Sequence, residues 1–218
     1  MRMKTRIVIL DFDGTLCDTR RNIVLTLRMT MERLGLSDCD EASCAATIGL
    51  TLKDAFIRLH PELSSEQADH CTEVYRVLFD ENKKKLVPQM FPHVMQTLEQ
   101  LHERGITLTV ASSRSHESLD VFVEELGLDK YTGYVLGAED TVHSKPDPEP
   151  VLKTLSELGF SAEECLVVGD MPYDILMGRN AGARTCGVSY GNSCREELLA
   201  SGADSVIDDF AELTALVK

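Results

Sequence analysis

Short runs of β-branched and other apolar residues recur along the chain, each bounded by polar or glycine-containing segments. A run that is apolar at consecutive positions predicts a strand buried on both faces of a sheet, because successive side chains of a strand point to opposite faces. Such runs lie at residues 6–10, 106–111, 165–168 and 184–188, and weaker ones lie at 134–136 and 205–207. These six segments are the predicted strands.

Apolar residues spaced three and four apart occupy several of the segments between these runs. They predict helices over residues 94–101, 119–126 and 151–158, and a glycine that suits a helix C-terminus follows each of them. Strands that alternate with helices across short connections are typical of a parallel sheet. The predicted fold class is therefore α/β, with a Rossmann-like parallel core and helices on both of its faces.

The alternation is interrupted between Asp18 and Leu86. This stretch has helical periodicity throughout and no convincing strand. Connections within an α/β unit are normally short, so about seventy residues of helix indicate an inserted module. We predict an α/β core domain from residues 1–17 and 87–218 and a small helical domain from residues 18–86.

Composition and charge narrow the classes of partner and compartment. The chain has 22 basic and 36 acidic residues, a formal net charge of −14, which disfavours nucleic acid and anionic membranes as partners. A small phosphorylated ligand remains compatible, because a few local cations or a metal ion can reverse the field inside one cleft. Seven cysteines without a CxxC pair predict free thiols in a reducing compartment. The apolar run near the N-terminus is too short for a signal peptide or a membrane span, so we expect a cytoplasmic protein.

Two pairs of aspartates follow predicted strands. Asp11 and Asp13 come directly after the first strand, within an Asp-Phe-Asp-Gly sequence, and point to the same side of an extended chain. Asp170 and Asp174 follow the strand at 165–168. Ligands of open α/β sheets bind at the carboxyl ends of the strands, and carboxylates gathered there are typical of a hard-cation site. The alternatives are a simple Asp-Gly turn for the first pair and a helix N-cap for Asp170.

Two further loops contain candidate functional groups, which are serine hydroxyls in one loop and a lysine in the other. Ser112 and Ser113 follow the strand at 106–111 and precede a helix, where hydroxyls and free backbone amides form an anion site. Lys145 lies in a proline-rich loop, Ser-Lys-Pro-Asp-Pro-Glu-Pro, that restricts its position. Serine as a helix cap and a purely structural proline loop are the competing interpretations.

The four motifs occur in the order DxDGT, strand–Ser, Lys-Pro and strand–GDxxxD, and in this order the chain resembles the haloacid dehalogenase-like hydrolase superfamily. The resemblance extends over essentially the whole chain, to the branch that contains phosphoglycolate phosphatase and β-phosphoglucomutase. It implies that residues 18–86 are a cap domain. It also implies that Asp11 is the nucleophile and Asp13 the general acid and base. Phosphate-binding residues would be Ser112, Ser113 and Lys145, and Mg²⁺ would be held by Asp11, the backbone carbonyl of Asp13 and Asp170, with Asp174 in support.

The resemblance also bears on the type of reaction. Dehalogenases of this superfamily lack the second aspartate and need no metal, so Asp13 disfavours dehalogenation. The pattern departs from the family at Pro92-His93, where Pro-Gly is usual. We expect a Mg²⁺-dependent phosphatase that acts on a small phosphorylated metabolite through an aspartyl-phosphate. The alternatives are a β-phosphoglucomutase-like sugar-phosphate mutase, an inorganic pyrophosphatase, or a catalytically idle relative that serves as a binding module.

Residues that would select the substrate belong to the cap, where the resemblance is loose. Lys53 and Arg58, next to a glycine-containing turn, are the candidate specificity residues, and ordinary surface charge is the alternative for both. We interpret the three lysines at 83–85 as a solvated charge run near the junction of cap and core. The six histidines have no ligand spacing, and most are expected on the surface. The protein is expected to be a monomer or a weak homodimer.

Overall fold

The computed structural model describes residues 4–217 and contains a six-stranded sheet in the order β5-β4-β1-β6-β7-β8. Every neighbouring pair in this sheet is parallel, which confirms the predicted α/β class. All six predicted runs form strands, with ends shifted by at most two residues. The strands are β1 (Ile7–Leu10), β4 (Thr107–Ala111), β5 (Thr132–Leu136), β6 (Cys165–Gly169), β7 (Arg184–Val188) and β8 (Ser205–Ile207).

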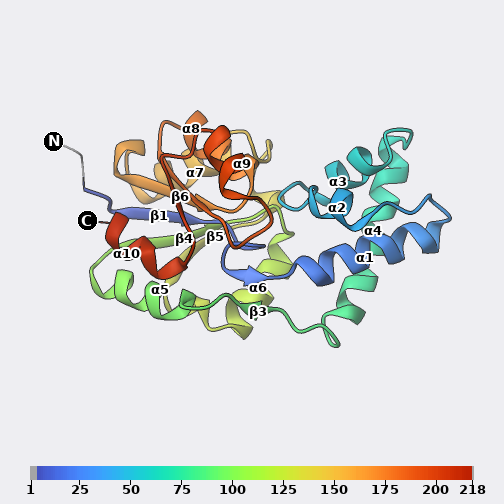
Figure 1. The fold of residues 1–218 in the computed structure, drawn as a ribbon, viewed down its shortest axis with the longest axis horizontal. Helices are drawn as coiled ribbons and strands as arrows, with labels where there is room; N and C mark the ends of the chain where they lie inside the picture. Colours follow the sequence, from blue (N-terminus) through green and yellow to red (C-terminus); the bar gives the residue numbers. More distant parts are fainter. Residues whose placement is uncertain (1–3, 218) are drawn as a thin grey trace.

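Helices cover both faces of the sheet, with α5 and α6 on one side and α7, α8 and α9 on the other (Figure 1). The central strand β1 shows why its sequence is apolar throughout. Val8 and Leu10 belong to the core cluster on the side of α5 and α6, whereas Ile7 and Ile9 pack toward α7 and α8. The helices of this domain are α5 (Val94–Glu103), α6 (His116–Glu125), α7 (Glu149–Leu158), α8 (Pro172–Asn180), α9 (Arg195–Ala200) and α10 (Leu213–Leu216), with 3-10 turns at Leu128–Lys130, Ala138–Asp140, Ala162–Glu164 and Phe210–Glu212.

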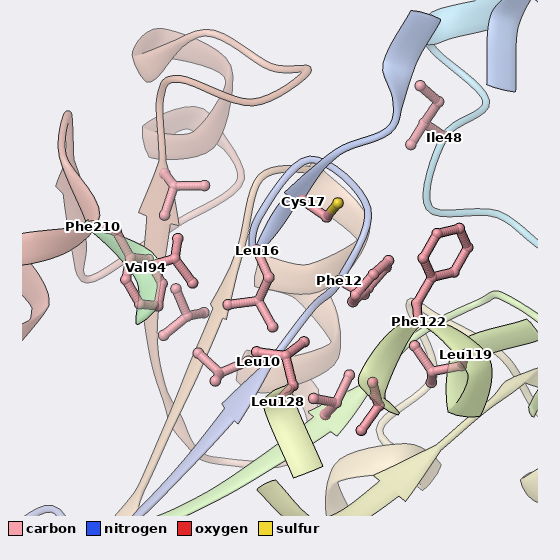
Figure 2. Close-up of a cluster of buried hydrophobic side chains, with 14 of the residues drawn as sticks. Leu10, Phe12, Leu16, Cys17, Ile48, Val94, Leu119, Phe122, Leu128 and Phe210 are labelled. Atoms are coloured by element: carbon pink, nitrogen blue, oxygen red, sulfur yellow. The ribbon is translucent and has the colours of Figure 1, made fainter. Parts of the chain in front are cut away.

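Four further helices lie beyond one end of the sheet (Figure 1). They are α1 (Arg20–Leu34), α2 (Glu41–Ala45), α3 (Leu52–Leu59) and α4 (Ser65–Asn82), and they fall within the segment predicted to be helical. Their side chains continue the main apolar cluster, in which Phe56 and Phe79 are buried together with Tyr75. Figure 2 shows Ile48 of this region at the edge of the cluster that also contains Phe12 and Phe122. We refer to this helical part as the cap, and its division from the core at residues 17/18 and 86/87 stays a prediction.

A small second sheet forms where the chain passes between the two parts. The two-residue strands β2 (Cys17–Asp18) and β3 (Gln89–Met90) pair in antiparallel fashion, and the backbone N–H of Phe91 donates to the Leu16 carbonyl at 3.0 Å. Two residues are too few to leave a period in the sequence, so this pairing was not predicted. It holds the two connections of the cap side by side.

The structure gives a physical meaning to the Pro92-His93 departure. His93 has a φ of 63°, in the left-handed region where glycine has no steric penalty. Its Nδ1 atom lies 2.7 Å from the Asp209 carboxylate, which adds a contact that glycine would lack. Histidine therefore occupies a position whose backbone favours glycine.

All seven cysteines and all six histidines lie within residues 4–217. The seven cysteines are free thiols, as expected. Most of the histidines are exposed, as expected, whereas His60 is buried and His116 is partly buried. No helix within residues 4–217 is both long and apolar enough to span a membrane.

Candidate active site

The predicted site residues meet at the carboxyl edge of the parallel sheet. In chain order the six strands are arranged 3-2-1-4-5-6, so the direction of winding reverses beside β1. Asp11 follows β1, Asp170 follows the adjacent β6, and Ser112 follows β4 on the other side of β1. Strands that run in the same direction end at the same edge, which is why these distant segments converge.

Three carboxylates form a buried cluster at this edge. Ligand oxygens of Asp11, Asp170 and Asp174 lie within 4.8 Å of one another, and all three residues are buried. Burial, together with the negative charge of Asp174, raises the pKa of Asp11 from 3.8 to about 7 despite the opposing effect of Lys145. Burial and the charges of Asp11 and Asp174 likewise raise the pKa of Asp170. Such a set of close oxygen donors with excess negative charge fits a hard divalent cation.

Lys145 supplies one positive charge to this cluster. Its Nζ atom donates to Asp11 Oδ1 at 2.5 Å and to Asp174 Oδ1 at 2.7 Å, and its side chain is 2% exposed. Burial lowers the pKa of the lysine, but the attraction of the two carboxylates outweighs it and the pKa is raised. Lys145 therefore stays charged beside the predicted nucleophile. One lysine among three carboxylates leaves the cluster negative, which again favours a cation.

Asp170 is held by residues that the sequence interpretation missed. Its Oδ2 atom accepts from the backbone N–H of Asn192 at 2.7 Å and from the Asn192 Nδ2 atom at 2.8 Å. Asn192 Oδ1 is buried without a hydrogen-bond partner. Asn192 lies in the loop after β7, so its place beyond a strand at the same sheet edge was the available signal.

Glycines let the backbone approach Asp170 closely. A Cβ atom on Gly14 would lie 2.2 Å from Asp170 Oδ2, and Gly14 also has a φ of 92°. A Cβ atom on Gly191 would lie 2.3 Å from the Asp170 Cβ. Larger residues would displace the carboxylate, so the glycine of the Asp-Phe-Asp-Gly sequence is needed for shape as well as for the turn.

Asp13 points to a different set of partners. Its carboxylate accepts from Thr19 Oγ1 at 2.7 Å and from Arg114 Nη2 at 2.5 Å and Nε at 3.2 Å. Asp13 is therefore not part of the carboxylate cluster through its side chain. The family resemblance implies that Asp13 binds the metal through its backbone carbonyl, and this role does not require the side chain.

A cavity of about 220 Å³ opens over these residues, between core and cap. Asp11 and Asp13 line it, together with Ser112, Ser113 and Arg114. The Ser113 hydroxyl donates to the Gly49 carbonyl of the cap at 2.6 Å and so joins the two parts. Cap residues on the opposite wall are largely apolar, and include Ile48, Leu50, Leu52, Ala55, Tyr75 and Phe79.

The predicted specificity residues do not reach this cavity. Lys53 and Arg58 are absent from its described lining, and Lys53 pairs with Asp69 of α4 at 2.8 Å. The cap cations that line the cavity are Arg76 of α4 and Lys83, which directly follows α4. Of residues 83–85, interpreted as a solvated run, Lys84 and Lys85 are exposed, whereas Lys83 is partly buried and lines the cavity.

One histidine belongs to a second acidic group, outside the cavity. His143, Asp147 and Glu149 lie close enough to share a ligand. The Glu149 carboxylate already accepts from the backbone N–H groups of Val142 and His143 at 2.9 and 2.8 Å. These bonds close the loop before α7, so the group has a structural explanation.

This fold, with its convergent aspartates, serine and lysine below a helical cap, identifies the chain as a member of the haloacid dehalogenase-like hydrolase family, whose sequence profile matches residues 8–188. The relatives specify the kind of hydrolase. "Probable phosphatase IndB" of Dickeya dadantii is 35% identical over 95% of this chain and 91% of its own. "Pyrophosphatase PpaX" of Anoxybacillus flavithermus is 29% identical over 99% of this chain and 98% of its own. The chain is thus a phosphatase of this family.

A solved structure agrees with the architecture. The crystal structure of a protein named "Putative haloacid dehalogenase-like hydrolase" from Bacteroides fragilis is 29% identical and superimposes with a TM-score of 0.87. The match covers 96% of this chain and all of the other. The similarity therefore includes the cap helices as well as the sheet.

Proposed function

We propose that this phosphatase requires Mg²⁺ and hydrolyses a small phosphorylated metabolite through an aspartyl-phosphate on Asp11. The observation that carries the proposal is the buried Lys145, which contacts Asp11 and Asp174 beside a third carboxylate, next to the cavity that Asp11 lines. A nucleophilic carboxylate and a phosphate group are both negative, so the site needs positive charge at this point.

The residues that would hold Mg²⁺ are Asp11, the backbone carbonyl of Asp13 and Asp170, with Asp174 in support. Their oxygens suit Mg²⁺, which prefers carboxylate, carbonyl and water ligands. When bound, the ion would offset the charge of the phosphoryl group and of the nucleophile. Asn192 and Thr15 keep Asp170 oriented, at 2.7 and 3.4 Å.

The protein's own side chains carry the two chemical steps. An oxygen of Asp11 forms a bond to phosphorus as the bond to the leaving oxygen breaks. Lys145 and Ser112 bind the phosphoryl oxygens in this step, and Ser113 lies next to Ser112 in the chain. Asp13 enters this step protonated and donates that proton to the leaving oxygen. It then removes a proton from the water that attacks phosphorus and releases Asp11.

The substrate has to be identified by assay, because the cavity wall of the cap is mostly apolar and its charges offset one another in part. It carries two cations, Arg76 and Lys83, and one carboxylate, Asp80, which pairs with Lys83 at 3.1 Å. Relatives named as pyrophosphatases make pyrophosphate the first compound to assay, and inorganic pyrophosphatase is therefore the second candidate function. A panel of sugar phosphates, phosphoglycolate, nucleotides and pyrophosphate, scored for phosphate release, would identify the class. The mutase alternative would instead give isomer interconversion without release of phosphate.

Acid-quenched protein tests the covalent step directly. During turnover of an aryl phosphate, mass spectrometry should find a phosphoryl group on the peptide that contains Asp11, and hydroxylamine should remove it. Asp11→Asn should abolish both the adduct and turnover. The matched control is Asp129→Asn, at an exposed aspartate outside the cavity lining, which should behave as wild type. Near-normal turnover by Asp11→Asn would overturn the proposed mechanism.

A further inference from the structure

A buried arginine lies between the core and the cap, and its position in the sequence had suggested no function. Arg114 follows the two serines after β4, and its side chain is 8% exposed. The guanidinium contacts both oxygens of Asp13, through Nη2 at 2.5 Å and Nε at 3.2 Å. Two parallel contacts of this kind fix the direction of a carboxylate as well as its distance.

Further hydrogen bonds fix both members of this pair. The Arg114 Nη1 atom donates to Ser118 Oγ of α6 at 3.1 Å, which orients the guanidinium from the core side. Thr19, the residue before α1, donates its hydroxyl to Asp13 Oδ1 at 2.7 Å instead of capping its helix. Asp13 is therefore held by Arg114, which follows β4 of the core, and by Thr19, which precedes α1 of the cap.

Three aromatic rings enclose the guanidinium. Its carbon lies 4.8 Å from the ring centres of Phe79 and Phe122 and 5.7 Å from that of Phe12. These distances are typical of cation–π contacts. Phe12 and Phe122 belong to the core and lie close together in Figure 2, whereas Phe79 belongs to α4 of the cap. Arg114 thus contacts Asp13, the core and the cap at once.

The stability of the fold does not by itself explain a buried pair of Arg114 and Asp13. Taking an arginine and an aspartate out of water has a large free-energy cost, and apolar residues of similar volume often stabilise a protein as well or better. A ring of phenylalanines is an environment in which such a replacement would pack readily. The charged pair instead holds a carboxylate in a defined position in the lining of the cavity.

We propose that Arg114 is a positioning residue that holds Asp13 toward the leaving oxygen, and that Phe79 makes this positioning depend on the placement of α4. The proposal rests on the acid–base role of Asp13 in the proposed function. Arg114 acts here through Asp13 alone, so its effect should disappear when Asp13 no longer transfers protons.

A double-mutant cycle of Asp13→Asn and Arg114→Met tests this dependence, with phosphate release from an aryl phosphate and from pyrophosphate as the assays. Arg114→Met should lower kcat roughly ten- to hundred-fold, the range expected for a misplaced catalytic group, with KM changed less than about three-fold. In the Asp13→Asn background the same change should alter kcat less than about three-fold. Arg114→Lys should recover part of kcat, because it keeps the charge but not the two-point contact.

Arg28 offers a matched control. It contacts Asp38 with the same geometry, at 3.0 and 2.5 Å, but both side chains are about half exposed and lie outside the cavity lining. Arg28→Met should leave kcat and KM unchanged. Phe79→Leu should lower kcat in the wild-type background and have little effect in Arg114→Met. It also provides the test if Arg114→Met does not fold, which thermal unfolding would reveal.

The outcomes separate this inference from the proposed function. If Arg114→Met lowers kcat by the same factor with and without Asp13, Arg114 acts independently and the inference is overturned. A higher KM at unchanged kcat would also overturn it, by making Arg114 a substrate-binding residue. If Asp13→Asn has normal activity, the acid–base role fails together with the inference, while Asp11 trapping still tests the nucleophile.

Discussion

Lys145 illustrates how one residue determines the charge balance of the site. It is separated by 134 positions from Asp11 and by 29 from Asp174, yet its ammonium contacts both carboxylates. A buried charge that loses its partner is strongly unfavourable, so the lysine and the carboxylates depend on one another. The lysine also gives the site a cation that does not depend on bound metal.

Lys145→Met should lower kcat/KM for every phosphorylated substrate by a similar factor, roughly 10²–10³, because the phosphoryl group is common to all of them. The measurement is kcat/KM for an aryl phosphate, pyrophosphate and phosphoglycolate. Lys130→Met, at an exposed lysine outside the cavity lining, is the control and should have no effect. A loss confined to one substrate would show that Lys145 selects the leaving group instead.

At the scale of the element, α4 brings cap residues over the site at helical spacing. Tyr75, Phe79 and Lys83 recur every four residues and all line the cavity, as does Arg76. Arg76 also reaches Glu139 of the core at 3.2 Å. Lys53 of α3 is turned instead toward Asp69, on the outer part of α4. The face of the helix therefore decides which cap cations line the cavity.

Lys83→Met should raise KM for pyrophosphate by roughly two- to five-fold, the effect of one partly exposed charge, and leave an uncharged aryl phosphate nearly unaffected. Lys53→Met should leave KM for both substrates unchanged. Steady-state kinetics of the two variants side by side provides the measurement. If Lys53→Met raised KM for pyrophosphate and Lys83→Met did not, specificity would belong to α3 rather than α4.

At the scale of the whole molecule, two neighbouring strand ends and the first turn of α8 bring three buried carboxylates together. The pKa of Asp11 is raised from 3.8 to about 7 when no metal is bound. Between these two values the folded protein retains a proton that the unfolded chain releases. The free energy of unfolding of the metal-free protein should therefore fall as pH rises from about 4 to about 7.

Bound Mg²⁺ should restore the free energy of unfolding that the protein loses when these carboxylates are ionised. We expect a large increase in Tm on addition of Mg²⁺ at pH 8 and a small one at pH 5.5, because protons compete with the metal for Asp11 and Asp170. Thermal unfolding of EDTA-treated protein, with and without Mg²⁺, measures the difference. Asp170→Asn should weaken the response at pH 8. Equal shifts at both pH values would contradict metal binding at this cluster.

The sequence determined the sheet and the floor of the site. Runs that are apolar on both faces specify buried parallel strands, and a polar residue directly after such a run must lie at the common carboxyl edge. This is why Asp11, Ser112 and Asp170 could be placed before any contact was known. The helical character of residues 20–82 was equally local, since it depends on periodicity within single segments.

The residues that surround these site residues could be identified only from the tertiary structure. Arg114 pairs with Asp13 across 101 residues, and Asn192 holds Asp170 across 22, and neither contact leaves a periodic pattern in the chain. The choice of Lys83 over Lys53 follows from how α3 and α4 pack on one another. Local patterns specify which face of an element is buried. The partner across an interface depends on how separate elements come together, and this is where the cavity wall and the setting of Asp13 were determined.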